Sequence, residues 1–153
     1  LGVDTVRRLA EVDNIVGIKD SSGNFDQMLQ YLEATAEKDF KVISGNDSLI
    51  LWNLLAGGVG GIAGCANVYP ENMVAIYENF IRGDLEAARK AQNAIRSFRE
   101  VFRFGNPNTV VKSATALLGY PVGKCRRPFH QLSDEAVREL KKVLEDNKAK
   151  GMA

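Results

Sequence analysis

The chain has 153 residues, of which 45% are hydrophobic and 25% are charged, which is typical of one soluble globular domain. Its formal net charge of +1 gives no sign of a nucleic-acid or membrane-surface partner, and no apolar run is long enough to cross a bilayer. The two cysteines, Cys65 and Cys125, lack CxxC spacing and are too few for a disulfide framework, so we expect a reducing, cytoplasmic setting.

The first half of the sequence alternates between helical and strand patterns. Apolar residues at helical spacing alternate with short apolar runs that end in turn-forming residues. This alternation is typical of parallel βα units. In chain order we expect a helix at 4–12, a strand at 15–19, a helix opened by the capping pair Asn24 and Gln27, a strand at 40–44, a helix capped by Asp47 that stops at Gly57, and a strand within 59–68.

After Pro70 every predicted element is a helix. These helices are expected at 70–83, 85–102, 109–119 and 133–148. Three parallel strands cannot close a barrel, because a (β/α)8 barrel needs about 250 residues. The pattern therefore predicts either a small open α/β sheet or the later part of a barrel, and the start at Leu1 suggests a partial or processed chain.

Lys19 ends the first predicted strand, at the edge where parallel βα folds carry their functional residues. Alternation along the strand directs Val16 and Ile18 toward the flanking helices and Lys19 to the opposite side. An apolar, crowded setting there would lower the pKa of a lysine and make its amine nucleophilic. The alternative is a lysine that pairs with Asp20 or Asp47 and reaches solvent. The residues alone leave both interpretations open.

Small residues follow the second and third predicted strands, in "SGND" at 44–47 and "GGIAGCAN" at 60–67. They leave room for a ligand whose oxygen atoms could bind exposed backbone groups, although close packing also explains such glycines. "CRRPF" at 125–129 could bind an anion or lie on a solvated surface. His130 has no metal-ligand spacing around it, and no nucleotide-binding or metalloenzyme motif occurs, so we expect no metal and no cofactor.

Four segments taken together resemble the dihydrodipicolinate synthase / N-acetylneuraminate lyase family: "NIVGIKDSSGN", "VISGND", "LLAGGVGGIAGCANVYP" and "NPNTVVKSATALLGYPVGKCRRPF". The resemblance covers nearly the whole chain. It implies α/β architecture as a partial (β/α)8 TIM barrel from the sixth strand onward. Residues 1–83 would then form the last three βα units, and residues 84–153 a C-terminal helical extension.

The resemblance also implies site residues and an activity. Lys19 matches the family's Schiff-base lysine, and the backbone near Gly45 and Ile62 matches positions that line the pyruvate pocket. The implied activity is that of a pyruvate-dependent lyase of the dihydrodipicolinate synthase type, which joins pyruvate to aspartate semialdehyde. The family's Gly-Thr-Thr-Gly-Glu segment and its proton-relay tyrosine are absent from this sequence. We therefore expect this chain to be inactive by itself.

Other functions remain possible within and outside the family. A 2-keto-3-deoxy sugar acid aldolase or an N-acetylneuraminate lyase would use the same Lys19, although "GCAN" at 64–67 replaces the Ser-Thr-Tyr-Asn common in sialate lyases. A non-catalytic half-barrel scaffold or oligomerisation module is an alternative of another class. The expected partners are a keto acid and an aldehyde. An incomplete barrel exposes strand edges, so we also expect a homo-oligomer or pairing with the missing barrel half.

Overall fold

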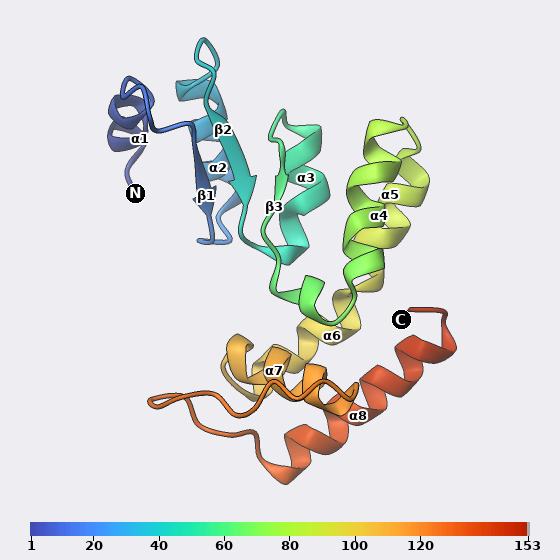
Figure 1. Ribbon diagram of the computed structural model, residues 1–153. Helices are drawn as coiled ribbons and strands as arrows, with labels where there is room; N and C mark the ends of the chain where they lie inside the picture. Colours follow the sequence, from blue (N-terminus) through green and yellow to red (C-terminus); the bar gives the residue numbers. More distant parts are fainter. Residues whose placement is uncertain (153) are drawn as a thin grey trace. The chain divides into compact units, whose positions relative to one another are not determined.

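The computed structural model describes residues 1–152, which divide into two compact units (Figure 1). The strand unit comprises Leu1–Ala63 and Ile76–Ala88, and the helical unit comprises Gly64–Ala75 and the chain from Arg89 onward. The expected division of a complete barrel between residues 83 and 84 stays a prediction. Within residues 1–152 no helix combines the length and apolarity that a bilayer crossing needs.

The strand unit is built on a sheet of three parallel strands in the order β1-β2-β3, as the sequence predicted (Figure 1). These are β1 (Gly17–Asp20), β2 (Lys41–Ser44) and β3 (Gly60–Gly61). Gly17 pairs with Lys41 and Ser44 pairs with Gly61, so all three strands run in register toward one edge. The third strand is much shorter than predicted, because from Gly64 the chain winds into a short 3-10 helix.

Three helices accompany these strands: α1 (Val3–Leu9), α2 (Phe25–Ala34) and α3 (Ile50–Leu55). The Asn24 side chain accepts a hydrogen bond of 3.1 Å from the Gln27 main-chain N–H, so the predicted cap of α2 is confirmed. The predicted cap by Asp47 is wrong. Asn46 accepts from the Ser48 N–H at 3.0 Å and opens the 3-10 turn η1 (Asp47–Leu49), which leads into α3.

The apolar core of the strand unit lies between α1, α2 and the sheet. Its buried members are Val6, Met28, Tyr31, Phe40 and Val42. Side chains of this size contribute about 1.5–3 kcal/mol each when fully buried, so this cluster fixes the helices against the strands.

Alternation along β1 agrees with the prediction at one of the two apolar positions. Ile18 packs against the core. Val16 was predicted to face the helices as well, but its side chain is 68% exposed. The reason is that β1 begins only at Gly17, so Val16 lies outside the strand and does not follow its alternation.

The helical unit has more breaks than its sequence predicted. The predicted helix over 85–102 is interrupted at Ile95, whose backbone angles of φ −75° and ψ −6° open a turn. The predicted helices near 70, 109 and 133 are present. In chain order the elements are η2 (Gly64–Asn67), α4 (Pro70–Ile81), α5 (Leu85–Ala94), α6 (Arg96–Glu100), η3 (Val101–Phe104), α7 (Pro107–Leu117) and α8 (Asp134–Ala149), with α4 and α5 contributing residues to both units.

A buried polar network holds α8 in the helical unit. Asn147 on α8 is 1% exposed; its amide nitrogen donates to the Tyr69 hydroxyl at 2.9 Å. The Ser97 hydroxyl donates to the Asn147 side-chain oxygen at 2.9 Å. Burial raises the pKa of Tyr69, and its ring packs edge-on against Phe98 with centroids 5.5 Å apart. Both ends of the Asn147 amide are therefore bonded.

We expect Asn147→Ala to lower the free energy of unfolding of the helical unit by about 2 kcal/mol, because buried groups left without partners cost about 1–3 kcal/mol. Urea unfolding followed by circular dichroism measures this. Asn93→Ala, at an exposed site on α5, is the matched control and should change stability little. Equal stability of the two variants would contradict the structural role of the network.

Candidate functional site

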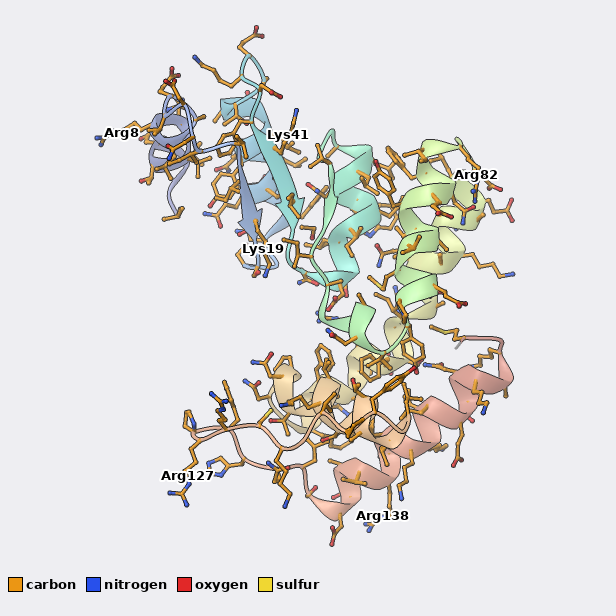
Figure 2. All side chains as sticks on the ribbon, viewed as in Figure 1. Arg8, Lys19, Lys41, Arg82, Arg127 and Arg138 are labelled. Carbon is orange, nitrogen blue, oxygen red and sulfur yellow. The ribbon has the colours of Figure 1, made fainter. Side chains whose placement is uncertain are left out.

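Lys19 lies near the carboxyl end of β1, on the face of the sheet opposite the apolar core (Figure 2). It pairs with Ile43 of β2, while its neighbour Ile18 points to the core. Its side chain is exposed, so the crowded, buried environment that the sequence suggested is not found within residues 1–152. Lys19 therefore presents its amine on the open face of the sheet.

Gly45 lies directly under the Lys19 side chain. A Cβ atom at position 45 would be only 2.6 Å from Lys19 Cε and 2.1 Å from Ser21 Oγ. The Gly45 N–H also donates to the Asp20 carbonyl oxygen at 2.7 Å, which holds the two strand ends together. A side chain at this position would have to displace the ends of the Lys19 and Ser21 side chains, and glycine leaves that space to them.

Ile62 follows β3 at the same edge. Its main-chain N–H donates to the Ser44 carbonyl oxygen at 2.8 Å, and its side chain is 54% exposed. Lys19, Gly45 and Ile62 thus lie at the carboxyl ends of three neighbouring parallel strands. The structure brings together the three residues that the sequence singled out.

The carboxylates that the sequence offered as partners of Lys19 do not pair with it. No ion pair within residues 1–152 includes Lys19. The Asp20 carboxylate instead accepts from the Ser22 hydroxyl at 2.7 Å and from the Ser22 N–H at 3.3 Å. Of the alternative drawn from the sequence, the pairing with Asp20 or Asp47 is not found within residues 1–152, whereas the exposed side chain agrees with it.

Ser21 is a site residue that the sequence reasoning missed. Its hydroxyl lies beside Lys19 above Gly45, and it has no hydrogen-bond partner within the described part of the chain. The adjacent Ser22 differs, because its hydroxyl donates to Asp20 and accepts from the Asn24 N–H at 3.1 Å. The only signal in the sequence was the position of Ser21 two residues after Lys19, which places it on the same side of an extended chain as the lysine, whereas Ser22 falls on the other side.

Other polar residues in the segments singled out from the sequence have local structural contacts. Asn46 caps η1, and the Asn67 side chain donates to the Gly64 carbonyl oxygen at 3.1 Å within η2. The His130 carbonyl accepts from the Thr109 hydroxyl at 3.2 Å. No group of three or more His, Cys, Asp or Glu side chains within residues 1–152 is placed to hold a metal ion.

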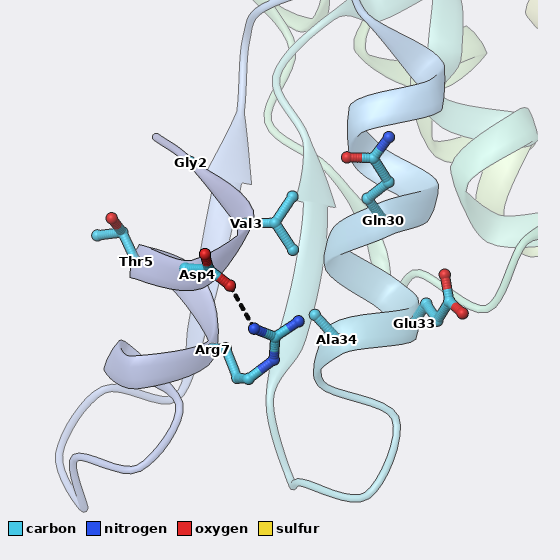
Figure 3. Close-up of a pocket in the computed structure, with 8 residues that line it drawn as sticks. All are labelled: Gly2, Val3, Asp4, Thr5, Arg7, Gln30, Glu33 and Ala34. Atoms are coloured by element: carbon cyan, nitrogen blue, oxygen red, sulfur yellow. Dashed lines mark hydrogen bonds and ion pairs between the residues drawn. The ribbon is translucent and has the colours of Figure 1, made fainter.

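A pocket of about 780 Å³ lies between α1 and α2, away from the strand ends (Figure 3). Asp4 and Arg7, both on α1, form an ion pair at its edge. Its lining includes neither Lys19 nor Gly45 nor Ile62. The one cationic side chain that lines this pocket, Arg7, is already ion-paired, so the strand ends are the stronger candidate for a catalytic site.

The sequence model of the Dihydrodipicolinate synthetase family matches residues 1–147. A 4-hydroxy-tetrahydrodipicolinate synthase of Archaeoglobus fulgidus is 40% identical over 141 residues, which cover 92% of this chain and 48% of that protein. The enzyme of the same name from Oceanobacillus iheyensis is 38% identical over 148 residues, covering 95% and 49%. The chain thus spans about half the length of these curated relatives.

Solved structures give the same result. The 4-hydroxy-tetrahydrodipicolinate synthase of Methylacidiphilum fumariolicum SolV superposes with a TM-score of 0.89 at 31% identity, over 97% of this chain and 50% of that chain. YagE, a prophage protein of E. coli K12 solved in complex with pyruvate, gives a TM-score of 0.89 at 27% identity, over 97% and 51%. The chain belongs to the dihydrodipicolinate synthetase family.

Proposed function

We propose that this chain is part of a pyruvate-dependent Schiff-base lyase of the 4-hydroxy-tetrahydrodipicolinate synthase type, which joins pyruvate to aspartate semialdehyde. The observation that carries the proposal is the unpaired Lys19 amine at the carboxyl edge of the sheet, with Gly45 beneath it. The names of the relatives support the activity, and the pyruvate complex of YagE supports the keto acid.

The complete enzyme is proposed to be a (β/α)8 barrel, of which this chain supplies the last three strands and the C-terminal helical extension. The parallel βα order and the half-length match to the relatives support this assignment. Among residues 1–152, β1 pairs with β2 on one side and with no strand on the other, so its other edge is available to a further strand. That strand would come from the part of the relatives that this chain does not span, or from another copy.

Lys19 is proposed to form the covalent intermediate. Its neutral amine attacks the ketone carbon of pyruvate to give a carbinolamine, and loss of water leaves a protonated imine. The imine draws electrons from the adjacent methyl group, which gives up a proton and becomes a nucleophilic enamine carbon. This carbon attacks the aldehyde carbon of the second substrate, and hydrolysis of the new imine regenerates the Lys19 amine.

The neighbouring main chain is proposed to bind the keto acid. The N–H groups of Gly45 and Ile62 both donate to neighbouring strand ends, so neither is available to a ligand. The Ile62 carbonyl oxygen and exposed side chain are then the ligand contacts, the oxygen accepting from the carbinolamine hydroxyl. Gly45 contributes space, and the unpartnered Ser21 hydroxyl can bond a substrate oxygen beside Lys19.

We expect Lys19→Arg to abolish borohydride trapping of pyruvate, because a guanidinium stays protonated and cannot form an imine. The experiment uses the product of the complete gene, with peptide mapping of the reduced adduct. Lys41→Arg, on the neighbouring strand β2, is the control and should retain the adduct. The 153-residue chain alone should trap no pyruvate.

An adduct on Lys112 or Lys124 would refute the assignment of Lys19. If the complete gene product formed no adduct with pyruvate, the result would favour a non-catalytic scaffold.

We expect Gly45→Ala to slow pyruvate trapping by about 100-fold, because a displacement of about 1 Å at a reacting group can cost that much. The added methyl group would lie 2.6 Å from Lys19 Cε, so the lysine must move. The trapping rate and the melting temperature are measured together. Gly2→Ala is the control, since a Cβ there meets nothing within 4 Å. An unchanged trapping rate in folded Gly45→Ala would show that Lys19 does not depend on this contact.

A further inference from the structure

Strand β3 is too short and too glycine-rich to hold its own position. It consists only of Gly60 and Gly61, and glycine weakens a strand because it has no side chain to pack and much conformational freedom to lose. Ile62, which follows it, nevertheless has a well-defined hydrogen bond to β2. Support for this segment must come from outside the strand.

Helix α3 supplies that support through a buried amide. Asn53 is fully buried, and its side-chain nitrogen donates to the carbonyl oxygens of Val42 on β2 and Gly60 on β3, both at 3.1 Å. One side chain thus joins two neighbouring strands from the helix side of the sheet. The contact to Gly60 lies two residues before Ile62.

The packing around Asn53 leaves it little freedom. A Cβ atom at Gly58 would lie 2.2 Å from the Asn53 side-chain oxygen, so the amide is pressed against the turn before β3. One turn earlier on α3, Ile50 packs against Gly61, where a Cβ would lie 2.6 Å from its Cγ1 atom. The helix therefore fixes β3 by one polar and one apolar contact.

We propose that Asn53 is a positioning residue for the keto-acid site, which places the main chain of Ile62 relative to Lys19. This inference rests on the proposed function. Asn53 touches no reacting group; it acts through Gly60 on the two residues that follow.

A second observation separates this role from simple stabilisation. The Asn53 side-chain oxygen is the only buried side-chain nitrogen or oxygen within residues 1–152 that has no hydrogen-bond partner. An unpartnered buried acceptor is unfavourable, and a leucine of similar size would remove it. Stability alone therefore gives only a weak reason for asparagine at this position. The Asn53 side-chain nitrogen, by contrast, bonds to β2 and β3 at once and so positions both strands.

Asn53→Leu in the complete gene product tests the proposal. The pyruvate concentration for half-maximal borohydride trapping (half-saturation) should rise about tenfold, because the variant binds pyruvate less tightly. The maximal trapped fraction and the melting temperature should change little. Asn147→Leu is the matched control, a buried asparagine of the helical unit. It should lower the melting temperature and leave half-saturation unchanged. If Asn53→Leu does not fold, Asn53→Ser replaces it, because its shorter side chain cannot reach both carbonyls.

Amide hydrogen exchange of Ile62 provides a readout that does not depend on activity. Loss of the Asn53 contacts should speed exchange of the Ile62 N–H relative to that of Leu140, a buried residue of α8 in the helical unit, even if the wild-type protein traps no pyruvate. The absence of trapping in the wild type would thus refute the proposed function without deciding the role of Asn53. Unchanged Ile62 exchange, or unchanged half-saturation in a folded variant that traps pyruvate, would overturn the positioning role.

Discussion

The parallel pairing of β1 with β2 is the constraint on which the rest of the site depends. Their register sets Lys19 opposite Ile43 and brings Gly45 beneath the lysine. Side chains alternate along a strand, so a shift of one residue would turn Lys19 into the apolar core and bring Ile18 to the open face. The pairing is also close at its start, where a Cβ on Gly17 would lie 2.5 Å from the Lys41 carbonyl oxygen. Gly17 at the start of β1 and Gly45 after the end of β2 therefore let the two strands approach closely, and this close pairing fixes the position of Lys19.

Much of this arrangement follows from local sequence patterns. The apolar run before Lys19 predicted the strand, and the Asn24–Gln27 pair predicted the start of α2, because both depend on neighbouring residues. The prediction of Asp47 as the cap failed, because the neighbouring Asn46 can also accept from a helix N-terminus and only the turn geometry decides between them. The break at Ile95 has no glycine or proline to mark it.

The supporting residues of the site could not be predicted because their contacts are distant in sequence. Asn53 donates hydrogen bonds to carbonyl groups on two strands, and one of these, Val42, lies eleven residues earlier in the chain. Ser21 becomes a site residue only because Gly45 is folded beneath it. A pattern of residue types identifies a strand and its end, but not which side chain of another element will reach its backbone.

The position of the Asp20 side chain explains why Lys19 stays unpaired although the next residue in the chain carries a carboxylate. Alternation along β1 directs Asp20 to the side opposite Lys19, where it is 8% exposed and bonded to Ser22. Ser22 thus holds the negative charge on one side of the strand, while Ser21 remains on the other side with the amine. The two adjacent serines therefore have different contacts: Ser22 bonds the Asp20 carboxylate, whereas the Ser21 hydroxyl lies beside the Lys19 side chain above Gly45.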